Sequence, residues 1–322
     1  MMDRRAFLAG VAALSAGTRA RAQSAAGPRI GWIAYTDPGV AQAAFQDGMR
    51  TLGHSGSNAV RIETRVLDAN PESARAALEE LQRLQVALIV TQGGAGPVVH
   101  RLNAERTPML FSFSGDPVAA GMVASFGRPG GNTTGVSFLS LELVGKRLEV
   151  MKEMAPSVRR VAIVANPQHY GEKAELRASL DAAEQLGMQT TYVQLQPGED
   201  PAAAFGHIRR ERVQGIVVFP DAGMVARAKG IAEFALQERL LAVSGWGQFA
   251  RAGFVATYGP NLQAAYSRMA YFADRLLKGA AAGSLPVELP TRIELLVNLK
   301  TAKALGLAIP QSLLLRADEV IQ

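Results

Sequence analysis

The most restrictive feature of this 322-residue chain is a repeated alternation of short apolar runs with longer amphipathic segments. Residues 29–35 predict a buried strand, and residues 40–52 follow with apolar side chains at helical spacing. The same order recurs through residue 277. Strands that alternate with helices predict parallel sheets built from right-handed βαβ units. We therefore predict an α/β fold.

The alternation falls into two consecutive sets, which predicts two Rossmann-like lobes with parallel sheets rather than one long sheet. The predicted strands cover residues 29–35, 60–67, 86–91, 108–113, 158–165, 189–195, 213–219, 240–243, 254–258 and 293–298. The predicted helices cover residues 40–52, 71–84, 141–154, 173–186, 201–212, 224–238, 262–277 and 299–305.

The join between the two sets lies near residues 130–135, a Gly/Asn/Thr cluster typical of a turn or hinge. We predict a first lobe over residues 28–138, with part of residues 262–322 added to it. Residues 139–261 then form the second lobe. The tail from residue 285 onward could return to either lobe, because its strand follows the second set.

The N-terminus has the three parts of an export signal. Arg4 and Arg5 precede an apolar run over residues 6–17, and an Ala-x-Ala motif ends at Ala22. We expect residues 1–22 to be a cleaved signal peptide and the mature protein to be periplasmic. The paired arginines resemble a twin-arginine signal, which leaves the export route open. No later stretch is long and apolar enough to insert into the membrane.

Composition argues against several classes of protein. The absence of cysteine excludes disulfides and thiolate chemistry, and the four histidines are isolated in sequence. The net charge of +6 falls to +3 without residues 1–22, and the basic residues are scattered, so we expect no nucleic-acid partner. Residues 94–99 begin like a dinucleotide fingerprint but lack its third glycine. We expect no cofactor and no metal.

Ligands of doubly wound sheets bind at the carboxyl ends of the strands. The residues at these places are small hydroxyls, glycines, aromatics and a few carboxylates. The candidate ligand-binding residues are Thr36, Asp37, Thr91, Gly93, Gly94, Ala95, Phe113, Ser114, Asp116, Ser137, Phe138, Asn166, Tyr170, Asp221, Trp246 and Tyr258.

Such a set suits a small organic solute. Hydroxyls and the first amides of helices bind carboxylates, an aspartate holds an ammonium group, and aromatic rings stack on an apolar body. Thr36, Ser114 and Asp116 could equally cap helices, so each alone is ambiguous. The clustering of the whole set at strand ends is the stronger indication of a binding cleft.

Several sequence blocks resemble the TrpX-like ABC transporter substrate-binding family. They are Ser114-Gly115-Asp116-Pro117-Val118, residues 126–137 (FGRPGGNTTGVS), Lys146-Arg147-Leu148-Glu149, Tyr258-Gly259-Pro260-Asn261-Leu262, Pro286-Val287-Glu288, residues 298–310 and residues 317–321. The resemblance covers essentially all of the mature chain, but the loops at residues 91–96 and 166–170 are not typical of it.

The resemblance implies a type I periplasmic-binding-protein fold, with a ligand held between two lobes that close about a hinge. It implies an ABC permease and its ATPase as partners, and an amino acid or aromatic carboxylate as solute. By position, the best candidates for ligand contact are Ser114, Asp116, Ser137, Asn166, Asp221 and Tyr258.

We therefore expect a monomeric solute-binding protein that catalyses no reaction. One alternative keeps the fold but makes the protein a sensory receptor for a signalling partner. Another is an exported α/β enzyme with Asp116 and Asp221 as an acid/base pair across the cleft. A transcription repressor of similar lobes would need a helix-turn-helix where the export signal stands.

Overall fold

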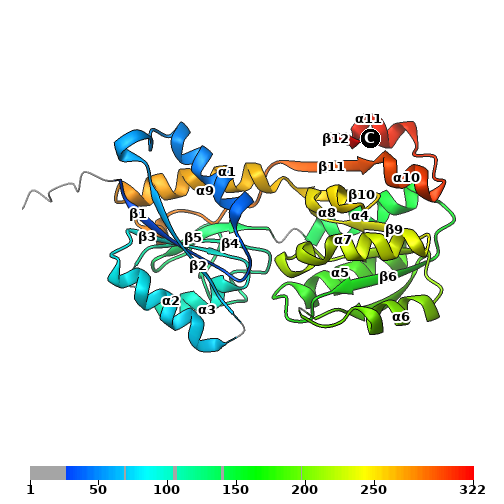
Figure 1. Ribbon diagram of the computed structural model, residues 1–322, viewed down its shortest axis with the longest axis horizontal. Helices are drawn as coiled ribbons and strands as arrows, with labels where there is room; N and C mark the ends of the chain where they lie inside the picture. The colour runs from blue at the N-terminus through cyan, green and yellow to red at the C-terminus, as the bar shows by residue number, and fades with distance from the viewer. Residues whose placement is uncertain (1–26, 69, 104–106, 139–140, 197) are drawn as a thin grey trace, which may run out of the picture.

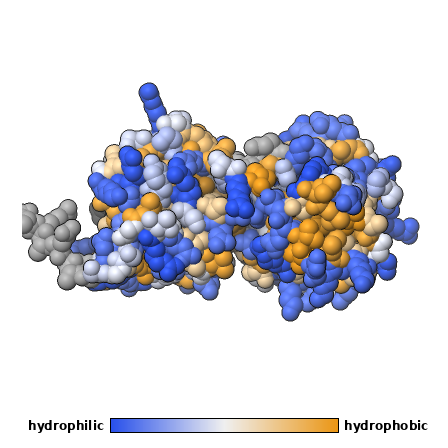
Figure 2. All heavy atoms as spheres, turned by 90° about the horizontal axis from the view of Figure 1, so that it is seen from above, coloured by the Kyte–Doolittle hydropathy of each residue, from blue (hydrophilic) through white to orange (hydrophobic). Residues whose placement is uncertain are grey.

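The computed structural model describes residues 27–322 apart from residues 69, 104–106, 139–140 and 197. This part of the chain forms two α/β lobes side by side along the long axis (Figure 1). Seen from above, they are two rounded masses joined at a narrower waist (Figure 2). The predicted export segment lies outside the described residues. No helix within them has the length and apolar character needed to cross a bilayer.

The first lobe holds a parallel sheet in the order β2-β1-β3-β4-β5. Alternate residues of β1 point to its two faces. Trp32 packs against Phe45 of α1 on one face, and Ile33 shares a core with Leu81 of α2 on the other. The elements are β1 (Arg29–Ala34), α1 (Gly39–Thr51), β2 (Arg61–Val66), α2 (Pro71–Arg83), β3 (Leu88–Gln92), α3 (Ala95–Asn103), β4 (Met109–Phe113) and β5 (Thr133–Ser137).

Helix α9 (Leu262–Leu277) completes the first lobe from far along the sequence. It lies against α1, as the orange and blue helices show in Figure 1. The two helices approach closely because Gly48 has no side chain: a Cβ there would stand 2.7 Å from the Cβ of Ala270. The Ser267 hydroxyl also donates to the Ala44 carbonyl at 3.2 Å.

The second lobe holds a sheet in the order β12-β11-β10-β9-β8-β6-β7. All neighbours are parallel except β10 and β11, which are antiparallel. Its elements are α4 (Leu141–Met154), β6 (Arg160–Ala165), α5 (Glu172–Gln185), β7 (Gln189–Gln194), α6 (Ala202–Arg210), β8 (Gly215–Val218), α7 (Ala222–Gln237), β9 (Leu241–Ser244), α8 (Gly247–Ala252), β10 (Ala256–Pro260), β11 (Ile293–Asn298), α10 (Leu299–Leu305), α11 (Gln311–Arg316) and β12 (Glu319–Ile321).

The described chain passes between the lobes three times. It crosses from β5 to α4, from β10 to α9, and from Glu288 to β11. Before the third crossing, Glu288 lies beside β5: its amide donates to the Gly135 carbonyl at 3.1 Å, and its carbonyl accepts from Ser137 at 3.0 Å. The strand β11 then extends the second sheet. The hinge is therefore built from three neighbouring segments.

The prediction of two α/β lobes with parallel sheets is confirmed, apart from the antiparallel β11. The interpretation of residues 130–135 as a turn or hinge is wrong for its second half. The turn ends at Asn132, and its Gly130 and Gly131 have φ angles of +70° and +57°. Strand β5 begins at Thr133, and Gly135 lets it lie against Phe111, whose carbonyl oxygen is 2.2 Å from where a Cβ would stand. The helices α3, α8 and α11 and the strand β12 were also not predicted.

Candidate ligand-binding site

The two lobes touch at the carboxyl ends of their sheets. This contact joins Phe113, Ser114 and Gly115 of the first lobe to Tyr170 and Gly171 of the second, and we call it the interlobe contact. The rings of Phe113 and Tyr170 lie 5.5 Å apart, edge to face. A Cβ on Gly115 would stand 2.8 Å from the Tyr170 Cβ, and one on Gly171 would stand 3.0 Å from the Ser114 carbonyl oxygen. The lobes are therefore in a closed arrangement.

The first-lobe side of the site contains the loop from β3 into α3. Gly93 has a φ of +62°, and its amide donates to the Ser112 carbonyl at 2.7 Å. This turn lets the helix begin at Ala95. The first amides of a helix have no partner within it and attract anions. The Thr91 hydroxyl lies beside this first turn, fully buried and without a hydrogen-bond partner among the described residues.

Aromatic side chains gather on the hinge side of the interlobe contact. The ring of Phe138 lies 6.2 Å from Trp246 and 5.9 Å from Tyr266, edge to face in both pairs. The Ser112 hydroxyl donates to the Tyr266 hydroxyl oxygen at 3.4 Å, and burial raises the pKa of Tyr266 to about 12. Phe138 and Trp246 come from different lobes, so this cluster also joins them. Tyr266 was not among the predicted site residues.

Two tyrosines stand at the solvent edge. Tyr35 is 43% exposed and Tyr170 is 48% exposed, whereas most aromatic residues are buried. Gly94 lies beneath Tyr35, with the ring edge 3.9 Å from where a Cβ would stand. Burial of part of its ring and the nearby Tyr170 raise the pKa of Tyr35, and the positive charge of Arg101 opposes this effect. The two tyrosines, one from each lobe, therefore lie near each other at the exposed edge of the contact.

The second-lobe side holds a buried charged cluster. Arg147 of α4 donates from Nε to the Tyr258 carbonyl at 3.1 Å, and its Nη1 lies 3.7 Å from Glu175 Oε2. His169 Nε2 lies 3.2 Å from Glu175 Oε1. Arg147 is only 3% exposed, because Gly245 leaves room for its guanidinium. We call Arg147, His169, Glu175 and Asp221 the second-lobe charge cluster.

The charges of this cluster change the pKa values of its members. Burial disfavours the charged form of His169, but the hydrogen bond to Glu175 and the charges of Glu175, Asp221 and Glu172 outweigh it and raise its pKa. Burial also raises the pKa of the Asp221 carboxyl, and His169 and two backbone amides offset this only in part. Both effects favour the protonated forms.

Four predicted polar residues hold the backbone of their own loops. Asp221 Oδ1 caps α7 by accepting from the Gly223 and Met224 amides, at 2.6 and 3.0 Å. Asp116 Oδ1 accepts from the amides of residues 118 and 119, Asn166 Oδ1 from that of residue 168, and Asp37 Oδ1 from that of residue 39. Capping therefore explains these residue types in part, but the Oδ2 atom of Asp221 keeps no partner among the described residues.

The structure brings most of the predicted residues to this one region. Thr36 and Asp37 follow β1, Ser137 donates to the Gly115 carbonyl at 3.2 Å, and the Tyr258 carbonyl holds Arg147. The prediction missed Arg147 and Glu175, which lie in helices rather than just after strands. The motif at residues 146–149 was the signal that could have identified Arg147.

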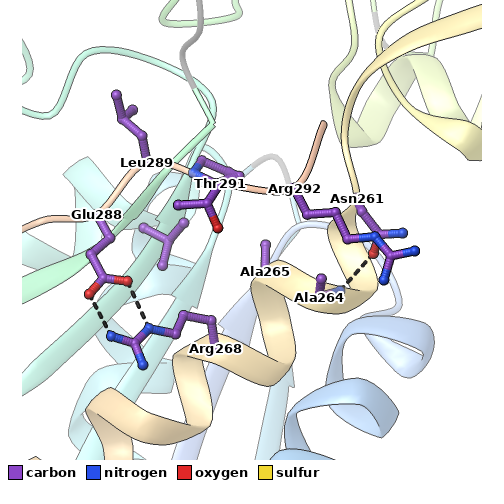
Figure 3. Close-up of a pocket in the computed structure, with 10 residues that line it drawn as sticks. Asn261, Ala264, Ala265, Arg268, Glu288, Leu289, Thr291 and Arg292 are labelled. Atoms are coloured by element: carbon purple, nitrogen blue, oxygen red, sulfur yellow. Dashed lines mark hydrogen bonds and ion pairs between the residues drawn. The ribbon is translucent and has the colours of Figure 1, made fainter. Parts of the chain in front are cut away.

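A separate pocket of about 520 Å³ lies at the hinge and contains none of the predicted residues. It is bounded by the first turns of α9 and by residues 288–292 (Figure 3). At one end Arg268 forms a two-bond ion pair with Glu288, at 2.7 and 2.8 Å. The pocket therefore lies beside the crossing segments and outside the region between the strand ends.

Comparison with known proteins identifies the family. A family model described as ABC transporter substrate binding protein matches residues 39–321. A tyrosine-binding protein from Clostridioides difficile is 22% identical over 201 residues, which is 62% of this chain. The match spans 57% of that relative, so it covers little more than half of its length.

Solved structures show the same fold. An ABC domain in complex with L-Trp from Streptococcus pneumoniae has a TM-score of 0.84 at 19% identity, covering 92% of this chain and 100% of the other. The ligand-free, open structure of a substrate binding protein with adhesive properties from Clostridium difficile has a TM-score of 0.69 at 18% identity, covering 92% and 99%. The resemblance noted in the sequence is thereby confirmed. Since the family model covers most of its length, this chain belongs to the ABC transporter substrate binding protein family.

Proposed function

We propose that this protein captures an amino acid or an aromatic carboxylate by closing its two lobes, and delivers it to an ABC permease and its ATPase. The observation that carries the proposal is the interlobe contact, where an aromatic ring and the backbone of each lobe meet at the carboxyl ends of the two sheets. A ligand that contacts both lobes binds the closed arrangement more tightly than the open one. This difference in binding free energy is what shifts the protein toward closure.

Each lobe supplies part of the binding surface in this proposal. Residues 28–138 with α9 form the first lobe, and residues 139–261 with β11 and β12 form the second. The Gly93-Gly94-Ala95 turn and the hydroxyls of Thr36 and Ser114 would receive a carboxylate. The rings of Tyr35, Phe113 and Tyr170 would enclose an apolar or aromatic body. The tyrosine and L-Trp named for the related proteins agree with this solute class.

The protein would act as a receptor rather than as an enzyme. Asp116 and Asp221 are the pair considered for acid/base catalysis. The carboxylate of Asp116 accepts from a backbone amide of its own loop, and that of Asp221 caps the N-terminus of α7. We further propose that residues 1–22 direct export to the periplasm and are removed there. The mass of the protein purified from the periplasm would test this, since cleavage after Ala22 leaves Gln23 as the first residue.

The melting temperature of the mature protein tests the proposed solute class. A ligand that binds only the folded state raises the midpoint, by an amount that grows with concentration above Kd. A panel of the standard amino acids with aromatic acids such as 4-hydroxybenzoate should contain at least one compound that raises it by several degrees. If none does, the proposed solute class is wrong.

A further inference from the structure

The hinge pocket is the space of about 520 Å³ between the first turns of α9 and residues 288–292, and all three crossings bound it. Val136 lies in β5, which leads into the first crossing, and Asn261 lies at the second. Residues 288–292 begin the third. The Asn261 amide donates to the Arg292 carbonyl at 2.9 Å, which ties the second and third crossings together. A molecule that fills this pocket would therefore contact every segment about which the lobes turn.

One cationic side chain of the pocket has no counter-charge. Arg268 and Glu288 neutralise each other at one end through two hydrogen bonds, at 2.7 and 2.8 Å. Arg292 lies at the other end (Figure 3), and its exposed guanidinium has no hydrogen bond or ion pair with any described residue. The carboxylate of Glu294 is not part of the lining, and its Oε2 accepts from the Asn261 side chain at 2.5 Å. Two arginines against one glutamate leave the lining with an excess of positive charge.

The floor between these two ends is apolar. Ala264 and Ala265 of α9 have side chains of a single carbon, which leaves space above the helix (Figure 3). Val136 and Leu289 add branched side chains, and Leu289 is 44% exposed. Thr291 adds a hydroxyl group. The pocket therefore combines an apolar floor with a hydroxyl and an unpaired guanidinium, which suits a small organic anion.

From this combination we propose that the hinge pocket is a second ligand site, separate from the region between the strand ends, for a small aliphatic carboxylate. The carboxylate accepts from the Arg292 guanidinium and the Thr291 hydroxyl, and the alkyl group lies on Ala264 and Ala265. The lobes are closed in this structure, so the ligand fits the spacing that the crossings have on closure, and its occupancy favours the closed arrangement. Binding here does not depend on the proposed function, whereas the effect on solute capture rests on it.

Three probes of similar size test the charge of the ligand: isobutyrate, isobutyramide and isobutylamine. The proteins are the mature chain, Arg292→Gln, Ala264→Leu and Arg275→Gln. Arg292→Gln removes the cation, and Ala264→Leu fills the floor with a residue that suits a helix. Arg275→Gln is the matched control, because Arg275 is an exposed arginine of α9 outside the pocket, and its side chain has no partner among the described residues. Magnetic resonance titration of the backbone amides of residues 288–292 measures affinity, and small-angle scattering measures the radius of gyration.

Isobutyrate should shift these amide signals and bind roughly fivefold or more tightly than the amide or the amine. Arg292→Gln and Ala264→Leu should each weaken it by a similar factor, and Arg275→Gln should behave as the parent protein. Saturating isobutyrate should lower the radius of gyration of the parent protein and, at the same concentration, leave that of Arg292→Gln nearly unchanged.

Equal binding of the three probes, or an isobutyrate affinity that Arg292→Gln leaves unchanged, would overturn the anion site while leaving the proposed function intact. Binding at residues 288–292 without a change in radius would overturn the effect on closure. Failure of every amino acid and aromatic acid to bind would instead refute the proposed solute class and not the hinge site, because these titrations contain no other ligand.

Discussion

Replacing Gly171 by alanine should weaken ligand binding more than it weakens folding. A Cβ at this position would stand 3.0 Å from the Ser114 carbonyl oxygen and 2.9 Å from His169 Nε2. The Ser114 carbonyl belongs to the other lobe, so this clash exists only when the lobes are closed. The carbonyl oxygen is a backbone atom and cannot rotate away, and contacts this short require the neighbour to move by a few tenths of an ångström.

The expected penalty follows from the cost of overpacking, which is about 1–3 kcal/mol for an added carbon in a well-packed place. His169 lies in the same lobe as Gly171, so the part of the penalty that it causes falls on both open and closed forms. We assign about 1–2 kcal/mol to the closed form alone. This corresponds to roughly 5- to 30-fold weaker binding.

Titration calorimetry with the amino acid found by the melting panel measures this loss, and the melting temperature of the ligand-free protein measures the effect on folding. Gly230→Ala is a matched control, because a Cβ at Gly230 meets no heavy atom within 4 Å. An affinity of Gly171→Ala within twofold of the parent protein would refute the reasoning, since the lobes would then not close at this contact.

Three further changes have clear directions. Because burial raises the pKa of the Asp221 carboxyl, the folded state favours its protonated form, so its contribution to the free energy of unfolding should fall as the pH rises through that raised pKa; chemical denaturation across pH should show this fall in the parent protein and a smaller one in Asp221→Asn. Arg147→Ala should lower the free energy of unfolding by about 3–5 kcal/mol in chemical denaturation, because it removes one of the two cationic groups beside the buried Glu175 and the donor to the Tyr258 carbonyl; a loss below about 1 kcal/mol would contradict the buried pair. Gly230→Ala, at an exposed position inside α7, should raise the free energy of unfolding by about 0.5–1 kcal/mol, and any decrease would contradict the open space seen there.

Local signals in the sequence were enough to predict most elements. Asn70 caps α2 by accepting from the Glu72 amide at 3.0 Å, as its position before the helix predicts. The bounds of α9 and β11 also follow from their apolar patterns. The failures lie where tertiary contacts decide the conformation. Gly135 is typical of a turn in isolation, but it belongs to β5 because the Phe111 backbone approaches it closely.

The candidate site was predicted less completely than the fold. Strand ends placed the predicted residues at one edge of each sheet, since parallel strands bring their carboxyl ends together. Arg147 and Glu175 reach that edge from α4 and α5, and no local pattern shows that two helices from separate units meet there. Tyr266 reaches the first lobe from beyond the second, which only the three crossings make possible.

Small-angle X-ray scattering with and without the bound amino acid tests the central claim most directly. Without ligand, the lobes should separate at the interlobe contact, so that Phe113 and Tyr170 lose their ring contact and the radius of gyration is larger. With a saturating amino acid, the radius should fall to the value calculated for the closed arrangement. An unchanged radius on saturation, with binding shown by calorimetry in the same sample, would contradict capture by closure.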